Sequence, residues 1–114
     1  MAQHDNEHAH AWTCSDTLAQ ALRGHTDLSP ADQLALLVAQ GADRLPLPGH
    51  GHTLQRWRAL AEVAAHSLSL AKLYEGHTDA LAILSELQAD LATEGLRWAV
   101  WCAEPPGERV QATP

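Results

Sequence analysis

Apolar residues recur at helical rather than alternating spacing in the first half of the chain. Between Ser29 and Gly41 they fall three or four positions apart, which predicts an amphipathic helix. Ser29 is a natural N-cap, Pro30 suits the first helical position, and Gly41 is expected to end the helix. The apolar face of this helix consists of Leu34, Leu37 and Val38. A shorter helix is predicted to start at Ser15 or Asp16 and to run through Arg23, stopped by Gly24.

A loop and two longer helices are predicted in the second half. The sequence LPLPGHGH, residues 45–52, holds two prolines and two glycines that exclude regular structure. Thr53 is expected to cap a long helix that runs to about Glu75 and is broken by Gly76. A further helix is predicted over residues 78–95, with Leu81, Leu84, Leu87 and Leu91 along one side. The stripe of the long helix consists of Leu54, Trp57, Ala61, Ala64, Leu68 and Ala71, widened by Val63, Leu70 and Tyr74.

The two ends of the chain have a different character. Residues 1–15 are rich in polar side chains with almost no apolar anchor, so we predict a disordered leader. Residues 96–104, LRWAVWCAE, have little helical period and predict an extended strand, whose backbone groups need a partner. The sequence therefore predicts an all-α fold, a small domain of about four helices with a C-terminal strand stub. We expect such a chain to be the front part of something larger.

Composition supports the helices and excludes several classes of function. Hydrophobic residues make up 46% of the 114 positions and are mostly Ala and Leu, which favour helices. The net charge of -7 argues against a nucleic-acid surface and against an anionic membrane surface. No apolar run could span a bilayer and the polar N-terminus is no secretory signal, so we expect a cytoplasmic protein. Cys14 and Cys102 are then expected to be free thiols.

Eight histidines raise the question of metal binding. After loss of Met1, the amino-terminal Ala2-Gln3-His4 offers the square of nitrogens that Cu(II) or Ni(II) accepts. We interpret this leader as a solvated segment without that role, and the metal hypothesis stays open. His50 and His52 share the proline-glycine loop, but no third ligand stands at a standard spacing. No metal site is predicted.

Few other residues suggest chemistry. Arg56 and Arg58 could hold a phosphate or carboxylate, but an exposed, solvated helix face is the simpler interpretation. His66 lies beside apolar residues and is expected to be a hydrogen-bonded, partly buried histidine. A glycine-rich phosphate loop and a nucleophile elbow are both missing, and no carboxylates are paired at a diagnostic spacing. No catalytic residue is predicted.

Two segments carry a resemblance to a known family. HSLSLAKLYEGHTDALAILSEL, residues 66–87, resembles the N-terminal helical domain of acyl-CoA dehydrogenase-family flavoproteins, with the Gly-His-Thr-Asp stretch as its most specific part. WCAEPPGERV, residues 101–110, is similar to the segment that opens the family's middle β-domain. The resemblance covers about residues 30–112. It implies a helical domain over residues 16–96 and the start of a middle β-domain over residues 97–114.

The resemblance implies FAD as cofactor and oxidation of the CH-CH group of an acyl-CoA thioester. The family's catalytic base comes from a region that this chain does not contain, so no catalytic residue is carried over. The implied flavin contacts are Trp101, Cys102 and Ala103. Because Ala103 stands where the family has threonine, and Gly107-Glu108-Arg109 replaces Gly-Ser-Asp, only backbone groups could serve. The resemblance therefore implies a chain that is inactive by itself.

Two hypotheses for function follow. In the first, the chain is the N-terminal part of an acyl-CoA dehydrogenase-like oxidoreductase, with acyl-CoA as substrate of the full-length family and a complementing chain or a homo-oligomer as partner. In the alternative, it is a small helical interaction or self-association module that uses an apolar face near Trp57 and Tyr74. Neither hypothesis includes a nucleic acid or a membrane as partner.

Overall fold

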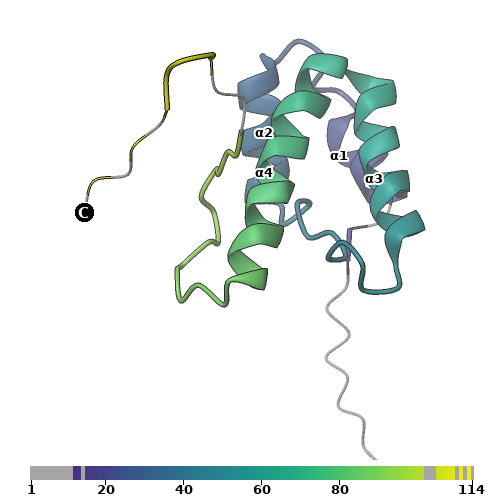
Figure 1. Cartoon of the computed structure of the whole chain (residues 1–114). Helices are drawn as coiled ribbons and strands as arrows, with labels where there is room; N and C mark the ends of the chain where they lie inside the picture. Colours follow the sequence, from purple (N-terminus) through teal and green to yellow (C-terminus); the bar gives the residue numbers. More distant parts are fainter. Residues whose placement is uncertain (1–11, 14, 102–104, 110, 112, 114) are drawn as a thin grey trace, which may run out of the picture.

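A computed structural model describes residues 12–13, 15–101, 105–109, 111 and 113. This part of the chain contains helices α1 (Ser15–Leu22), α2 (Pro30–Ala39), α3 (Thr53–His66) and α4 (Leu68–Glu86), and no strand (Figure 1). The predicted all-α fold of about four helices is confirmed. No helix in these residues is long and apolar enough to cross a membrane.

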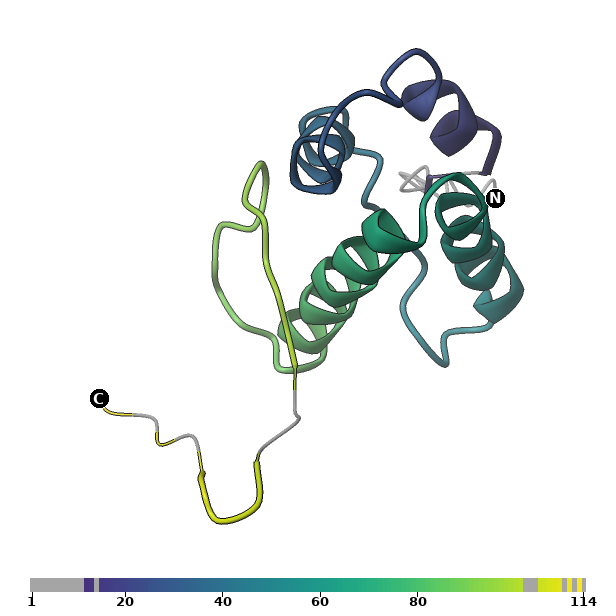
Figure 2. The ribbon, with the colours of Figure 1, turned by 90° about the horizontal axis from the view of Figure 1, so that it is seen from above.

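The helices pack in two pairs around one core. α3 and α4 lie side by side, α1 packs against α3, and α2 packs against α4 (Figures 1 and 2). The core consists of Leu18, Leu22, Leu34, Leu37, Val38, Ala42, Leu45, Ala59, Val63, Leu70 and Tyr74. The predicted apolar face of α2 is therefore buried as expected. On α3 and α4, by contrast, the residues expected to widen the stripe form the core, while Leu54, Trp57 and Leu68 are exposed.

The predicted ends of α2 are confirmed in detail. The Ser29 hydroxyl accepts a hydrogen bond from the backbone N–H of Asp32 at 3.1 Å, which caps the first turn. Gly41 has a φ of 68°, and its N–H donates to the Val38 carbonyl at 3.0 Å. The next N–H, of Ala42, donates to the Leu37 carbonyl at 2.8 Å. These two bonds form a Schellman motif, which stops the helix and turns the chain toward α4.

The predicted break at Gly76 is wrong. The helical hairpin bends at Ser67, which is extended (φ -159°, ψ 122°) and caps α4 by accepting from the Leu70 N–H at 3.2 Å. Ser67 was not recognised because it lies inside a continuous run of helix-forming residues. Gly76 lies within α4, held helical by the burial of Tyr74 before it and His77 after it. Thr53 is the first residue of α3 rather than its cap, since His52 occupies the cap position.

Replacing Gly76 with alanine is expected to raise the free energy of unfolding by about 0.5–1 kcal/mol, the helix preference of alanine over glycine. A Cβ at this position would lie 3.7 Å from the nearest heavy atom, the Val100 carbonyl oxygen, which is ordinary contact. Urea denaturation of the G76A protein measures the change. A loss of stability would show that residue 76 is not in a helix.

The predicted extension of the last helix to Gly95 is also wrong. α4 ends at Glu86, and Gln88 adopts a left-handed φ of 51°. The Gln88 N–H donates to the Ser85 carbonyl and the Ala89 N–H donates to the Leu84 carbonyl, both at 3.0 Å. This is again a Schellman motif, with glutamine where glycine is usual. No local signal marks this helix end, because glutamine is a good helix former.

Replacing Gln88 with glycine is expected to stabilise the protein by about 1 kcal/mol, because a left-handed conformation strains a residue that has a Cβ. Gln88 is exposed, so little side-chain packing is lost. Thermal unfolding followed by circular dichroism measures the effect. If α4 instead continued through residue 88, glycine would lower the melting temperature.

Residues 96–101 run along α4 as an extended segment without regular secondary structure (Figure 2). Trp98 and Val100 are half-buried, while Arg97, Ala99 and Trp101 are exposed. This alternation is what an extended chain with one covered face shows.

At the other end of the domain, Thr13, within the predicted leader, is buried, and its N–H donates to the Arg44 carbonyl at 2.8 Å.

Candidate functional site

His77 on α4 is a buried polar side chain with hydrogen-bond partners in two other parts of the chain. Its ring is fully buried, and Nε2 lies 2.7 Å from Oδ2 of Asp43, in the loop after α2. The backbone N–H of Trp98 donates to its Nδ1 at 2.9 Å. Because Nδ1 accepts, this geometry requires the neutral tautomer with the ring proton on Nε2, which donates to the carboxylate. One side chain thus joins α4, the loop after α2 and the extended terminal segment of residues 96–101.

Tyr74, one turn before His77, fixes the same loop to α4. Its hydroxyl donates to the Ala42 carbonyl at 2.9 Å, beside Asp43. Burial and, less strongly, the charge of Asp43 raise the pKa of Tyr74, while Arg56 lowers it. The net effect is an increase, so this side chain remains a neutral phenol and a hydrogen-bond donor. The Schellman turn at Gly41 and the Tyr74 bond together place the Asp43 carboxylate at the His77 ring.

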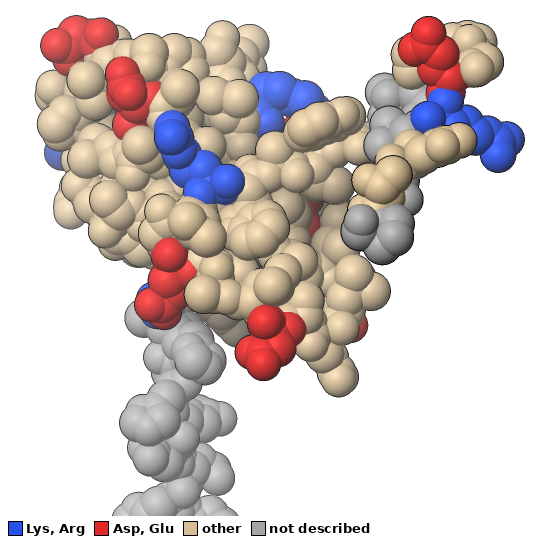
Figure 3. Space-filling model, turned by 90° about the vertical axis from the view of Figure 1, so that its left-hand side faces the viewer, with Lys and Arg blue, Asp and Glu red and all other residues tan. Residues whose placement is uncertain are grey.

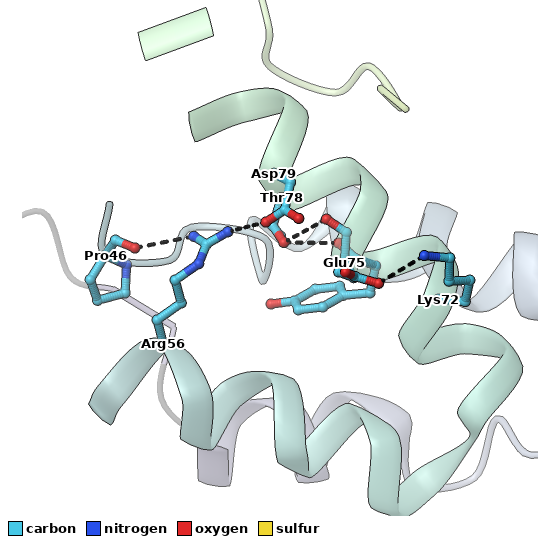
Figure 4. Close-up of polar contacts among 7 residues, drawn as sticks. Pro46, Arg56, Lys72, Glu75, Thr78 and Asp79 are labelled. Atoms are coloured by element: carbon cyan, nitrogen blue, oxygen red, sulfur yellow. Dashed lines mark hydrogen bonds and ion pairs between the residues drawn. The ribbon is translucent and has the colours of Figure 1, made fainter. Parts of the chain in front are cut away.

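Arg56 is not part of an exposed helix face, and that interpretation is wrong for this residue. Its guanidinium is buried and donates to the Pro46 carbonyl at 3.1 Å and to Oδ1 of Asp79 at 2.7 Å (Figure 4). It does hold a carboxylate, but one from its own chain. Arg56 therefore ties the proline-rich loop and α3 to α4. Arg58, in contrast, is exposed as expected.

An open groove of about 850 Å³ lies between the end of α2 and the second half of α4. Asp43, Arg56 and Thr78 line it, so the polar ties described above are part of its wall. Two exposed side chains that also line the groove form an ion pair, with Nη2 of Arg44 3.7 Å from Oε1 of Glu94. Figure 3 shows one face of the molecule, on which basic and acidic side chains are scattered singly rather than gathered in a patch of one sign. Among the residues that line the groove, Arg44 and Arg56 are balanced by Asp43 and Glu94, so no charge of one sign is concentrated there.

The predicted flavin-contact residues are only partly described. Trp101 is 77% exposed and follows, three positions on, the anchored Trp98. Cys102 and Ala103 lie outside the described residues. The predicted contact of these three residues with FAD stays a prediction.

Three other histidines were singled out from the sequence as possible ligands or as a buried residue: His50, His52 and His66. His66 is half-buried and its Nε2 lies 3.3 Å from Nε2 of Gln33, which confirms the predicted partly buried, hydrogen-bonded histidine. His50 and His52 are exposed, and the His52 ring lies 4.4 Å from that of Trp12. Among the described residues, no group of three possible ligands is arranged for a metal ion. Residues 1–11 and Cys14, including the candidate copper motif, lie outside the described part.

Sequence reasoning missed both the Asp43–His77 pair and the internal role of Arg56. His77 was noticed only as part of the Gly-His-Thr-Asp stretch, and Asp43 not at all. The pair is separated by 34 positions, so no local spacing could reveal it. A histidine among the apolar residues of a helix is a weak signal that a buried partner exists.

Comparison of the chain with protein-family models, with curated proteins and with solved structures finds no match in any of the three.

Proposed function

We propose that this chain forms the N-terminal helical domain of an acyl-CoA dehydrogenase-like, FAD-dependent oxidoreductase. One observation carries the proposal: the residues that lead directly into the second segment, Trp98 and Val100, lie against the first segment on α4. His77, from the first segment, accepts the Trp98 N–H three residues before the second segment begins. Gly76, its neighbour, faces the Val100 carbonyl. The geometry therefore supports one structural unit, in which α4 sets the path of the chain into the predicted flavin-contact residues.

We do not expect the described residues to make a flavin site by themselves. Trp101 offers one exposed aromatic ring, but the Trp98 N–H is already used by His77. FAD would supply the oxidising chemistry, and both the catalytic base and most of the flavin contacts would come from outside this chain. We assign the chain a positioning role and no catalytic step. As part of this proposal, the assembly works in the cytoplasm.

Recovery of flavin with the chain tests this proposal. We expect the purified chain to be colourless after incubation with FAD and desalting, and not to reduce a dye when given acyl-CoA. The same chain, tagged ahead of Met1 at its chromosomal copy and recovered from its source cells, is expected to carry flavin from its completing domains. Recovery in good yield without flavin would contradict the proposal. Flavin retained by the purified chain would contradict only the claim that the site is incomplete.

A second candidate function, a helical interaction module, is supported by an exposed apolar surface. Leu54 and Trp57, one turn apart on α3, are 57% and 63% exposed. Tyr74, expected on the same face, is fully buried, so that part of the expectation is wrong. If this surface drives self-association, light scattering during size-exclusion chromatography should show a dimer that W57Q dissociates. A monomer at all concentrations would exclude self-association.

A further inference from the structure

The terminal segment, residues 96–101, is attached to the helices by one hydrogen bond in the described part of the chain. Among the residues the structure describes, the bond from the Trp98 N–H to His77 Nδ1 is the one hydrogen bond between residues 97–101 and the helices. Apart from this backbone bond, the segment is attached through the side chains of Trp98 and Val100, which are only half-buried. The indole Nε1 of Trp98 is itself buried without a partner in the described part, which weakens the attachment. The segment therefore depends strongly on one ring nitrogen.

That nitrogen accepts a bond only while the imidazole is neutral. A protonated histidine carries N–H donors on both nitrogens, so Nδ1–H would face the Trp98 N–H. The bond to Asp43 would remain, since Nε2 donates in both states. We propose that His77 is a pH-sensitive latch: neutral, it holds residues 96–101 against α4, and protonated, it releases them while keeping its bond to Asp43.

The other titratable or charged groups near His77 do not decide whether the terminal segment is held. They are Asp43 after α2, Arg56 on α3, Tyr74 and Asp79 on α4, and Arg97 on the terminal segment. Arg56 and Asp79 neutralise each other in their ion pair, and Tyr74 stays a neutral phenol. Arg97 is exposed, where water screens its charge. Asp43 is the one of these groups that is bonded to the ring.

The latch has a consequence for the predicted flavin contact. Trp101 lies three residues beyond the fastened Trp98, so release would free the predicted flavin-contact residue from a fixed position. This consequence depends on the proposed function, whereas the latch itself does not.

Nuclear magnetic resonance of the ¹⁵N-labelled chain tests the latch without flavin. At about pH 8 we expect a coupling through the hydrogen bond between the Trp98 amide and His77 Nδ1. Toward about pH 5, the range in which histidines change charge, the coupling should vanish. Exchange of the Trp98 amide, relative to its intrinsic rate, should rise roughly fivefold to tenfold, the equivalent of one hydrogen bond. An unchanged Trp98 amide, or equal loss of protection throughout α2 and α3, would overturn the proposal.

Two neutral variants test the two ring nitrogens of His77 separately. In H77N the side-chain carbonyl stands near the place of Nδ1, so the Trp98 amide should stay protected at both pH values. In H77Q the amide nitrogen reaches toward Asp43 instead, so Trp98 should be unprotected at both. The control H50N alters an exposed loop histidine and should titrate like the parent protein. A Trp98 amide in H77N that still loses protection in acid would contradict the latch. If H77N does not fold, the titration of the parent protein decides.

Discussion

Replacing Arg56 with alanine is expected to lower the free energy of unfolding by about 3 kcal/mol. The substitution removes a charged hydrogen bond to Asp79 and leaves the Pro46 carbonyl without its donor in a buried position. Loss of a partner from a largely buried ion pair is costly, and the partial exposure of Asp79 reduces that cost. For a domain of this length, the melting temperature should fall by roughly 10–20 °C. Urea denaturation and calorimetry measure both quantities.

Arg58→Ala is the matched control, two positions along the same helix. Arg58 is exposed, so the change in unfolding free energy should stay within about 0.5 kcal/mol. Equal effects at the two positions would mean that Arg56 does not bridge α3 and α4.

Replacing Leu70 with alanine is expected to cost a similar amount, about 3 kcal/mol. Leu70 is fully buried between α3 and α4, so the substitution removes apolar contacts and leaves a cavity. Leu68, in the same turn of α4, is 79% exposed, and its replacement by alanine should change stability little. Chemical denaturation of the two variants side by side measures the difference.

This pair of variants also tests where the helical hairpin bends. The single long helix predicted from the sequence placed Leu68 on the main apolar stripe and Leu70 at its edge. With the bend at Ser67, the order is reversed. A larger loss of stability in L68A than in L70A would contradict the observed hairpin.

Helix ends were predictable where a residue is specialised for the end. Ser29, Pro30 and Gly41 mark α2 correctly, because each has a backbone or hydroxyl property that favours that position. Ser67 and Gln88 also mark helix ends, but their neighbours are good helix formers. At these two positions tertiary packing, which local propensity does not report, decides where the helix ends.

The candidate site was less predictable than the fold. Asp43 and His77 meet only because a turn after α2 and the packing of α2 on α4 bring them together. Arg56 carries the same charge as Arg58 and lies on the same helix. Only the three-dimensional position of the proline-rich loop distinguishes the two residues. His77, in the first of the two segments, is bonded to Trp98, just ahead of the second, and this hydrogen bond could not be derived from either segment alone.

The reaction of acyl-CoA with flavin recovered alongside this chain tests the proposed function most directly. The tagged chain from its source cells would be placed in a cuvette without oxygen and titrated with acyl-CoA thioesters of several chain lengths. We predict that at least one thioester bleaches the visible flavin band, as expected when the substrate's hydrogens pass to the cofactor. A flavin band that no acyl-CoA bleaches, but that dithionite does, would contradict the assignment to an acyl-CoA dehydrogenase-like enzyme.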